Sequence, residues 1–211
     1  MIIAVDGPAA SGKGTLARRL AVHYGLPYLD TGTLYRGVAR DMLDAGADLH
    51  DTQIAKQYAE LIDPETFSDA RIRRPEIGAA ASIVAKHDAV RQALLLYQRQ
   101  FAYQSRGAVL DGRDIGTVIC PDASVKLFVT ASLKERSRRR HAELKIRGEA
   151  VTLGQVEAEI AARDKQDSSR LSAPLKQADD SHFFDTTHLD IETTFQRVVR
   201  LIDTKISEKT F

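Results

Sequence analysis

The sequence has little cysteine: Cys120 is the single one among 211 residues. A lone cysteine excludes an internal disulfide and a cysteine-rich metal site within these residues. No histidine or asparagine neighbour suggests an activated thiol, so we interpret Cys120 as a small apolar side chain. The six histidines are scattered without the spacing of metal ligands, and we assign none of them to catalysis.

An excess of charge of either sign is also lacking. The 30 Lys and Arg residues nearly balance the 29 Asp and Glu residues, and the formal net charge is +1. A general binder of nucleic-acid polymers or membrane surfaces would usually carry a large basic excess, so we expect neither partner. No apolar run has the length that spans a membrane, and residues 1–5 end too abruptly at Asp6 for a signal peptide. We therefore expect a cytoplasmic protein.

Apolar runs alternate with helical patterns along most of the chain. We expect strands at 2–5, 27–29, 108–110, 125–129 and 182–184, and helices at 15–24, 33–45, 133–147, 155–167 and 191–206. Such alternation predicts the α/β class, with a parallel sheet covered by helices on both faces. Residues 51–104 show helical patterns alone, broken at Pro64, Pro75 and Asp88. This stretch is too long for a simple crossover, and we expect an inserted subdomain.

A glycine-rich loop follows the first expected strand and opens the first expected helix. Its residues are Gly7, Pro8, Ala9, Ala10, Ser11, Gly12, Lys13, Gly14 and Thr15, with the spacing of a phosphate-binding loop, or P-loop. Glycines let backbone N–H groups converge on phosphate oxygens, and the helix N-terminus adds a positive partial charge. Lys13 supplies an ammonium for the β and γ phosphates of ATP. A plain turn is the alternative, which the strand, spacing, lysine and helix together disfavour.

The loop departs from the common motif at one position. That motif has Ser or Thr directly after the lysine, whereas here Gly14 precedes Thr15. Thr15 is the candidate hydroxyl for the phosphates or for Mg²⁺. The Gly-Lys-Gly-Thr form is similar to that of nucleoside monophosphate kinases.

Two more polar segments follow expected strands. Residues 30–36 begin with a candidate helix N-cap, Asp30 or Thr31, and place Arg36 where it could reach an acceptor phosphate. Residues 111–117 contain two carboxylates and an arginine, which are poor core material. A polar turn is the alternative reading of the second segment. Its position beyond a central strand favours contact with a ligand.

The four motifs at 6–8, 12–15, 30–36 and 111–117 together resemble bacterial cytidylate kinase. The similarity continues through Ser82, Arg91, 121–123, 163–164, 167–170 and 185–186, and so covers nearly the whole chain. It implies a three-layer P-loop fold: a five-stranded parallel sheet flanked by helices, a helical insert that binds the monophosphate, and a short lid. In one domain, 1–211, we expect the core at 1–45, 105–135 and 170–211, the insert at about 46–104 and the lid at about 136–169.

The resemblance also implies an activity and a set of binding residues. The family transfers the γ-phosphoryl group of ATP to CMP or dCMP. Its CMP-binding residues map onto Thr31, Arg36, Ser82, Arg91, Arg113, Asp114, Arg163, Asp167 and Arg170. Members usually carry a further glycine where this chain has Ala10, from which we expect no consequence because alanine supports many turn conformations. The stretch between Arg36 and Ser82 is shorter than in some members.

The types of these residues suit cytosine. The carboxylate of Asp114 can accept a hydrogen bond from the exocyclic amine, and Arg91 and Ser82 can donate to the ring oxygen and nitrogen. Uracil would present a carbonyl to the carboxylate instead, a mismatch of about 1–3 kcal/mol. We therefore expect cytosine to be preferred over uracil.

A run of arginines forms the main charge asymmetry. Arg136 and Arg140 are four residues apart on one helix face, so their guanidinium groups could converge on a polyphosphate. A solvated helix face is the alternative. The turn at 148–154 is a candidate lid tip, and the resemblance implies that the lid donates arginines over the transferring phosphate. The candidate catalytic residues are Lys13, Arg113, Arg136, Arg140 and Arg163.

The expected chemistry explains why no catalytic dyad is apparent. A phosphate monoester is largely ionised at neutral pH, so its oxygen needs no base. Positioning and cationic stabilisation are what the reaction requires, with Mg²⁺ bridging the ATP phosphates. A lid mechanism needs one chain, and we expect a monomer.

Two other functions compete with this one. A P-loop kinase with a hydroxyl acceptor, such as shikimate or gluconate, would need a base, for which Asp30 or Asp114 could serve. A nucleotide-dependent switch would bind nucleotide and turn it over slowly, but the Asn-Lys-x-Asp tetrad that reads guanine is absent from the sequence.

Overall fold

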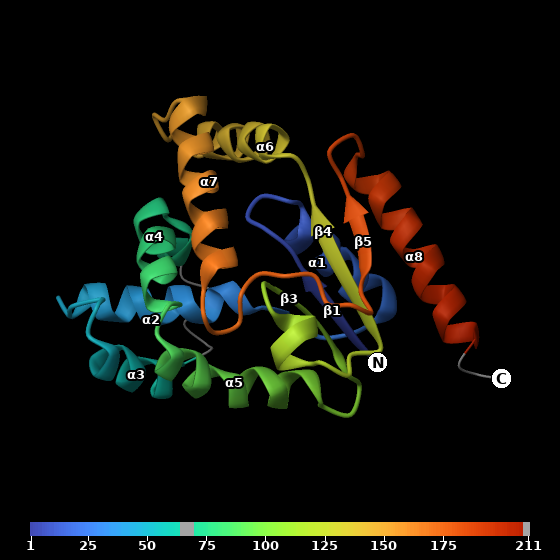
Figure 1. Ribbon diagram of the computed structural model, residues 1–211, viewed down its shortest axis with the longest axis horizontal. Coiled ribbons are helices and arrows are strands. Elements are labelled where there is room, and N and C mark those ends of the chain that lie inside the picture. Colours follow the sequence, from blue (N-terminus) through green and yellow to red (C-terminus); the bar gives the residue numbers. More distant parts are fainter. Residues whose placement is uncertain (64–69, 209–211) are drawn as a thin grey trace. The chain divides into compact units, whose positions relative to one another are not determined.

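The computed structural model describes residues 1–63 and 70–208. The chain divides into two compact units. Met1–Tyr28 and Ser105–Phe211 form one, which we call the sheet unit, and Leu29–Gln104 form the other, which we call the helical unit. Figure 1 shows the elements of both.

A five-stranded parallel sheet organises the fold. In chain order its strands are β1 (Ile2–Asp6), β2 (Tyr28–Asp30), β3 (Ala108–Gly112), β4 (Val125–Thr130) and β5 (His182–Asp185), and their order in the sheet is β2-β3-β1-β4-β5. The central β1 pairs in parallel with β3 and β4. Asp6 at its end lies opposite Gly112 of β3 and Phe128 of β4. The segments that follow β1 and β3 therefore leave the sheet side by side.

Helices α1 (Lys13–Tyr24) and α8 (Ile191–Glu208) pack together in the sheet unit (Figure 1). Their apolar faces share one core with β-branched side chains of the strands. Its buried members include Ile3, Val5, Leu16, Leu20, Val109, Val125, Leu127, Val129, Val198 and Ile202. Because side chains at i and i+4 of a helix share a face, Leu16 and Leu20 enter this core together.

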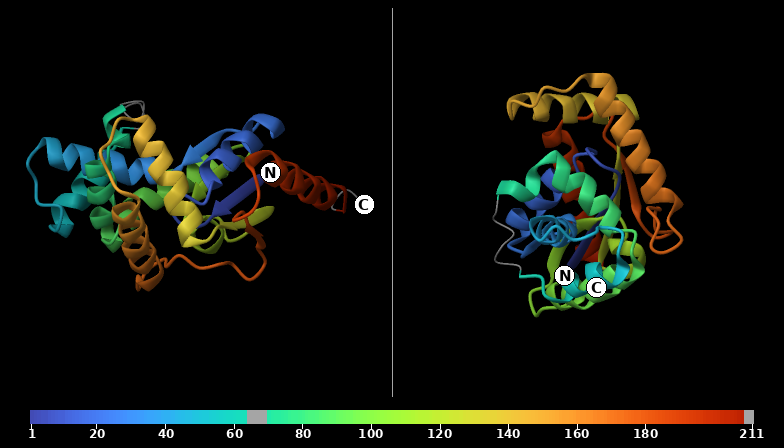
Figure 2. Two further views of the ribbon diagram at one scale, coloured as in Figure 1. Left: turned by 90° about the horizontal axis from the view of Figure 1, so that it is seen from above. Right: turned by 90° about the vertical axis from the view of Figure 1, so that its left-hand side faces the viewer.

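Helices α6 (Leu133–Ile146) and α7 (Leu153–Ser169) form a hairpin, seen from two further sides in Figure 2. A capping box starts α7: the Thr152 hydroxyl accepts from the Gln155 N–H while the Gln155 side chain accepts from the Thr152 N–H. The hairpin has a small core of its own, Leu144, Val156 and Ile160, against which Ala10 of the P-loop packs. The expected lid is thus a helical hairpin in contact with the loop that it was expected to cover.

The helical unit contains the following elements: α2 (Thr31–Asp44), α3 (Thr52–Glu60), η2 (Ala70–Arg73), α4 (Pro75–Val84) and α5 (Asp88–Ala102). Among its residues, α2 packs on α3 and α4, and α3 packs on α5. The expected helix breaks at Pro75 and Asp88 are confirmed, since α4 and α5 begin there. The break expected at Pro64 lies outside the described residues. Because α2 packs on α4, the compact unit starts at Leu29, earlier than the insert boundary of about 46.

The structure adds one element that the sequence did not predict. After β3 the chain forms η3 (Ile115–Ile119), a single turn in which the Cys120 N–H donates to the Ile115 carbonyl, five residues back, at 2.7 Å. Such π-type turns are rare and often lie at functional sites. This turn occupies part of the 111–117 motif.

Ala10 has a left-handed backbone conformation, with φ of 59°. Alanine is strained there by roughly 1–2 kcal/mol relative to the right-handed region, whereas glycine is not. The replacement of the family's usual glycine therefore has a local cost, contrary to the expectation from the sequence. The contact of the Ala10 side chain with the α6–α7 core offsets part of it.

Candidate active site

The backbone of the P-loop contacts the segment that follows β5. The Thr186 hydroxyl lies 3.1 Å from the Ser11 carbonyl oxygen, and Arg139 Nη1 donates to the same oxygen at 3.4 Å. Arg139 also donates to the Thr186 carbonyl at 2.7 Å. Gly7 passes so close to β4 that a Cβ there would lie 2.0 Å from the Val129 carbonyl oxygen. These contacts fix the loop backbone before any phosphate binds.

Lys13 lies at the start of α1 beside the carboxylate that ends β3. Its ammonium Nζ is 3.8 Å from Asp111 Oδ2, and the two side chains are 13% and 4% exposed. The hydroxyl of Tyr28 donates to the other oxygen, Asp111 Oδ1, at 2.7 Å. The predicted phosphate-binding lysine is therefore held by a buried carboxylate that the candidate site residues did not include.

Asp6 connects the P-loop to the 111–117 motif. Its two carboxylate oxygens accept from the N–H groups of Ile115, at 2.8 Å, and Gly116, at 2.7 Å. Burial raises the pKa of Asp6 to about 7, although the two N–H donors act in the opposite direction. A Cβ on Gly116 would lie 3.1 Å from Cδ of the Lys126 side chain and 3.4 Å, an ordinary contact distance, from Asp6 Oδ2. The carboxylate at the end of β1 thus fixes the turn after Asp114.

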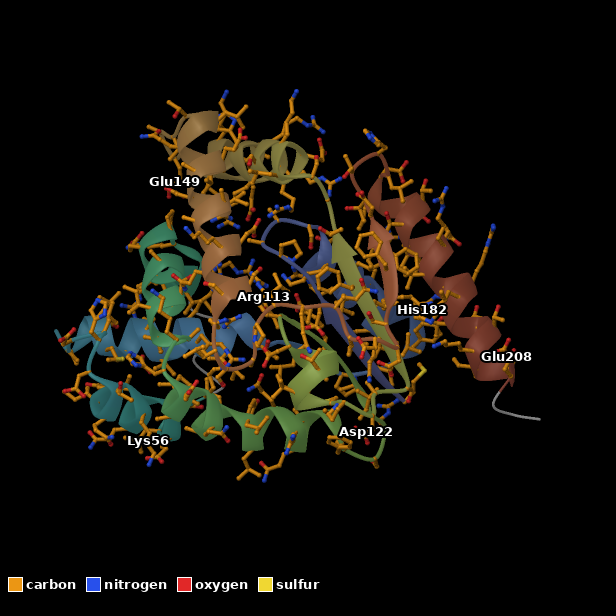
Figure 3. All side chains as sticks on the ribbon, viewed as in Figure 1. Lys56, Arg113, Asp122, Glu149, His182 and Glu208 are labelled. Atoms are coloured by element: carbon orange, nitrogen blue, oxygen red, sulfur yellow. The ribbon has the colours of Figure 1, made fainter. Side chains whose placement is uncertain are left out.

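A second charged cluster joins the end of β3 to the end of α7. Arg113 Nε donates to Asp167 Oδ2 at 2.7 Å, and Arg170 Nη2 lies 3.5 Å from Asp167 Oδ1 (Figure 3 labels Arg113). Burial tends to raise the pKa of Asp167, but the positive charges of Arg113, Arg163 and Arg170 outweigh it and the pKa is lowered. Asp114 is buried next to this segment. The cluster thus brings together four residues predicted to bind CMP, Arg113, Arg163, Asp167 and Arg170, and the fifth in this unit, Asp114, follows Arg113 in the chain.

The arginines of α6 point to different partners. Arg136 is buried, and its guanidinium contacts the Ala131 carbonyl at 2.8 Å, the Ala9 carbonyl at 3.3 Å and Asp164 Oδ2 at 2.6 Å. Arg140 instead pairs with Glu143 of its own helix at 2.8 Å. The two groups share a helix face, as expected, but the described structure does not bring them to one point. Arg136 ties the P-loop to α7.

The remaining predicted CMP-binding residues belong to the helical unit. Arg36 Nη1 donates to the Ile72 carbonyl at 2.9 Å, and a Cβ on Gly78 would lie 3.2 Å from the same nitrogen. The Ser82 hydroxyl donates to the Gly78 carbonyl at 3.1 Å. Arg91, which is 8% exposed, stacks over the Tyr35 ring at 5.6 Å. Thr31 is buried at the start of α2, where Asp30 is the cap: its side chain accepts from the Gly32 N–H at 3.0 Å.

A pocket of about 530 Å³ lies beside the P-loop in the sheet unit. Gly12 and Thr15 line it on one side, Arg138 of α6 on another, and the 186–191 segment on a third. Hydrogen bonds from Arg138 and Arg139 lower the pKa of Glu135, another lining residue, to about 2. The volume is within the usual range for small-molecule sites. No role was predicted for the 186–191 segment, because the match at 185–186 is the single feature of the sequence that points to it.

Comparison with known proteins identifies the family. Residues 3–204 match the family model described as cytidylate kinase. Curated relatives named cytidylate kinase include one from Bradyrhizobium, 54% identical over 203 residues that make up 96% of each chain. The chain belongs to the cytidylate kinase family. A second relative of the same name, from Methylobacterium, is 60% identical over 181 residues, 86% of each chain.

A solved structure agrees on the fold. An uncharacterised protein from Eubacterium ventriosum is similar with a TM-score of 0.58 at 14% identity, covering 96% of this chain and 98% of its own. The predicted family, the α/β P-loop fold and the predicted enzyme class, a nucleoside monophosphate kinase, are confirmed. No helix among the described residues is long and apolar enough to cross a membrane. The roles of individual site residues stay predictions.

The buried carboxyl of Asp6 gives a prediction about stability. Its pKa of about 7 exceeds the usual 3.8, so the folded protein binds the extra proton between these values. The stabilisation that the protonated Asp6 carboxyl contributes is therefore fully present below pH 3.8 and is lost as the pH rises through about 7. Between pH 5 and 7 we expect the free energy of unfolding of the wild type to fall by about 1 kcal/mol per pH unit relative to that of Asp6→Asn. Urea unfolding of both proteins measures this difference, and parallel pH curves would contradict it.

Proposed function

We propose that the protein transfers the γ-phosphoryl group of ATP to CMP or dCMP, giving ADP and CDP or dCDP. The observation that carries the proposal is that two segments leave adjacent paired strands: the P-loop after β1, with Lys13 at the start of α1, and the Arg113–Asp167–Arg170 cluster after β3. Family membership supplies the acceptor class, because the relatives are named cytidylate kinase.

The P-loop would bind the triphosphate of ATP. Within the described residues the buried Ser11 hydroxyl has no hydrogen-bond partner, which leaves it for a phosphate oxygen. Lys13 would exchange Asp111 for the β and γ phosphates. The pocket lined by Arg138 and the 186–191 segment adjoins the loop at Gly12 and Thr15, and we assign the nucleoside of ATP to it.

Mg²⁺ fits this site only as a partner of phosphate and water. The described residues contain no cluster of three His, Cys, Asp or Glu side chains that could hold a metal ion. The exposed hydroxyl of Thr15 at the start of α1 is the side-chain oxygen that we propose to hold the ion. When bound, Mg²⁺ would neutralise charge on the ATP phosphates.

The acceptor needs cations to bind it and a carboxylate to read its base. Arg113, Arg163 and Arg170 would bind its phosphate, which is already largely ionised at neutral pH. Asp114 would accept from the cytosine amine, while Ser82 and Arg91 would donate to the ring. No proton has to be removed from the attacking oxygen, so positioning and positive charge suffice.

The other catalytic roles stay as predicted. Arg136, Arg140 and Arg163 of the α6–α7 hairpin would stabilise the transferring group, with Arg36 and Thr31 at the acceptor phosphate. To do so, the Arg136 guanidinium would have to exchange its ion pair with Asp164 for a contact with the phosphate. We further propose that the enzyme acts as a cytoplasmic monomer.

The acceptor panel tests the proposal. Release of ADP in a coupled assay with ATP and Mg²⁺ should be stimulated strongly by CMP and dCMP, less by UMP, and not by AMP or shikimate. Stimulation by shikimate alone would favour a hydroxyl acceptor, with Asp30 or Asp114 as base. Slow turnover that no acceptor stimulates would favour a nucleotide switch.

Lys13 provides the sharpest test of the phosphate loop. Lys13→Ala should lower kcat by at least about a hundredfold, because a contact to the transferring phosphates is lost. The matched control is Lys56→Ala, which removes a half-exposed lysine paired with Glu60 on α3. Steady-state kinetics at saturating ATP and CMP measure both variants. Near-normal turnover of a folded Lys13→Ala protein would exclude the assigned role.

Asp114 provides the test of base recognition. Asp114→Asn should narrow the ratio of kcat/KM for CMP to that for UMP by about tenfold, because an amide can turn its N–H₂ group toward the uracil carbonyl. Asp122→Asn, in the turn after η3, is the control that should leave the ratio unchanged. An unchanged ratio in Asp114→Asn would remove this residue from base recognition.

A further inference from the structure

We infer that Tyr28 is a positioning residue for phosphoryl transfer, whose hydroxyl fixes the Asp111 carboxylate against Lys13 and the first turn of α1. The inference rests on the proposed function and deepens it at the ATP phosphates. Tyr28 belongs to none of the motifs by which the sequence pointed to a kinase.

Each oxygen of Asp111 has a neighbour from a different element. Oδ1 accepts from the Tyr28 hydroxyl at 2.7 Å, and Oδ2 lies 3.8 Å from Lys13 Nζ. The Asp111 side chain is 4% exposed, so little solvent competes for these oxygens. A donor on Oδ1 fixes the rotation of the carboxylate and therefore the place of the negative charge that faces Lys13.

Tyr28 is itself packed against its neighbours. Its ring packs against the core shared by α1, α8 and the strands, and the Arg18 guanidinium lies 5.6 Å from the ring centroid. Next to it, the Pro27 carbonyl accepts from the Val109 N–H of β3 at 2.8 Å, two residues before Asp111. The hydroxyl and the carboxylate thus come from neighbouring strands at a fixed register.

Gly14 explains why the carboxylate can lie here. A Cβ at this position would be 3.3 Å from Asp111 Oδ2 and 3.8 Å from the Tyr28 hydroxyl oxygen. The common P-loop motif has Ser or Thr at this position. The departure from that motif and the Tyr28–Asp111 pair are therefore two parts of one packing arrangement at the start of α1.

Loss of the hydroxyl should act on ATP. Without the Tyr28 hydroxyl on Oδ1, the Asp111 carboxylate is less constrained in rotation and can turn further toward Lys13, and the triphosphate must then displace a tighter ion pair. We expect Tyr28→Phe to lower kcat/KM for ATP about tenfold and to weaken ATP binding by a similar factor, as loss of one hydrogen bond to a charged group predicts. The KM for CMP should stay within about twofold of the wild-type value, because the Tyr28–Asp111 pair lies beside Lys13 of the loop that would bind ATP.

The chain supplies a matched control. The Tyr24 hydroxyl donates to Asp203 Oδ1 at 2.8 Å, which is the same pair of groups between α1 and α8. Tyr24→Phe loses the same type of hydrogen bond and should keep the wild-type affinity for ATP. Equal ATP affinities of Tyr28→Phe and Tyr24→Phe, measured by titration calorimetry without an acceptor, would overturn the inference.

A double-mutant cycle separates positioning from a general effect on stability. If Tyr28 acts through Asp111, the change Tyr28→Phe should have little further effect on ATP binding in an Asp111→Asn background. Full additivity would overturn the inference. Because calorimetry needs no acceptor, these outcomes are independent of the CMP-stimulated ADP release that decides the proposed function.

Discussion

The structure of this site depends on a buried carboxylate at the end of the central strand. Asp6 is the last residue of β1 and accepts two backbone hydrogen bonds from the turn after β3. Since β1 and β3 pair in parallel, this link joins the segment that becomes the P-loop to the one that carries Arg113 and Asp114. A charge buried among backbone donors is sensitive to small displacements, so both segments hold a common geometry.

The cations of the site are paired with carboxylates from distant parts of the chain. Lys13 faces Asp111, Arg113 faces Asp167, and Arg136 faces Asp164. This pairing explains how an enzyme that must bind two phosphorylated nucleotides has a net charge of only +1. Substrate phosphates would replace carboxylates as partners, so binding exchanges one anion for another and avoids leaving buried cations without a partner.

Sequence predicted most of the elements and the family, because these depend on local patterns. The strand–glycine loop–helix order and the helix starts at Pro75 and Asp88 are determined by residues that are adjacent in the sequence. What it missed depends on residues far apart. The pairing of Arg136 with Asp164, the pocket at 186–191 and the Tyr28–Asp111 pair follow from packing between elements that no local spacing encodes. The strain at Ala10 likewise appears only in its backbone angle.

The anchoring of the P-loop by Thr186 has a consequence for how the protein is made. Ser11 and Thr186 are 175 positions apart, and β5, which Thr186 follows, is the last strand in chain order. The loop precedes both partners along the chain, so the Arg139 contact can form only after residue 139, and the Thr186 contact only after residue 186, has been synthesised. We therefore expect the nucleotide site to become fully held only after Thr186 has been added, so ATP binding would stabilise the chain late in folding.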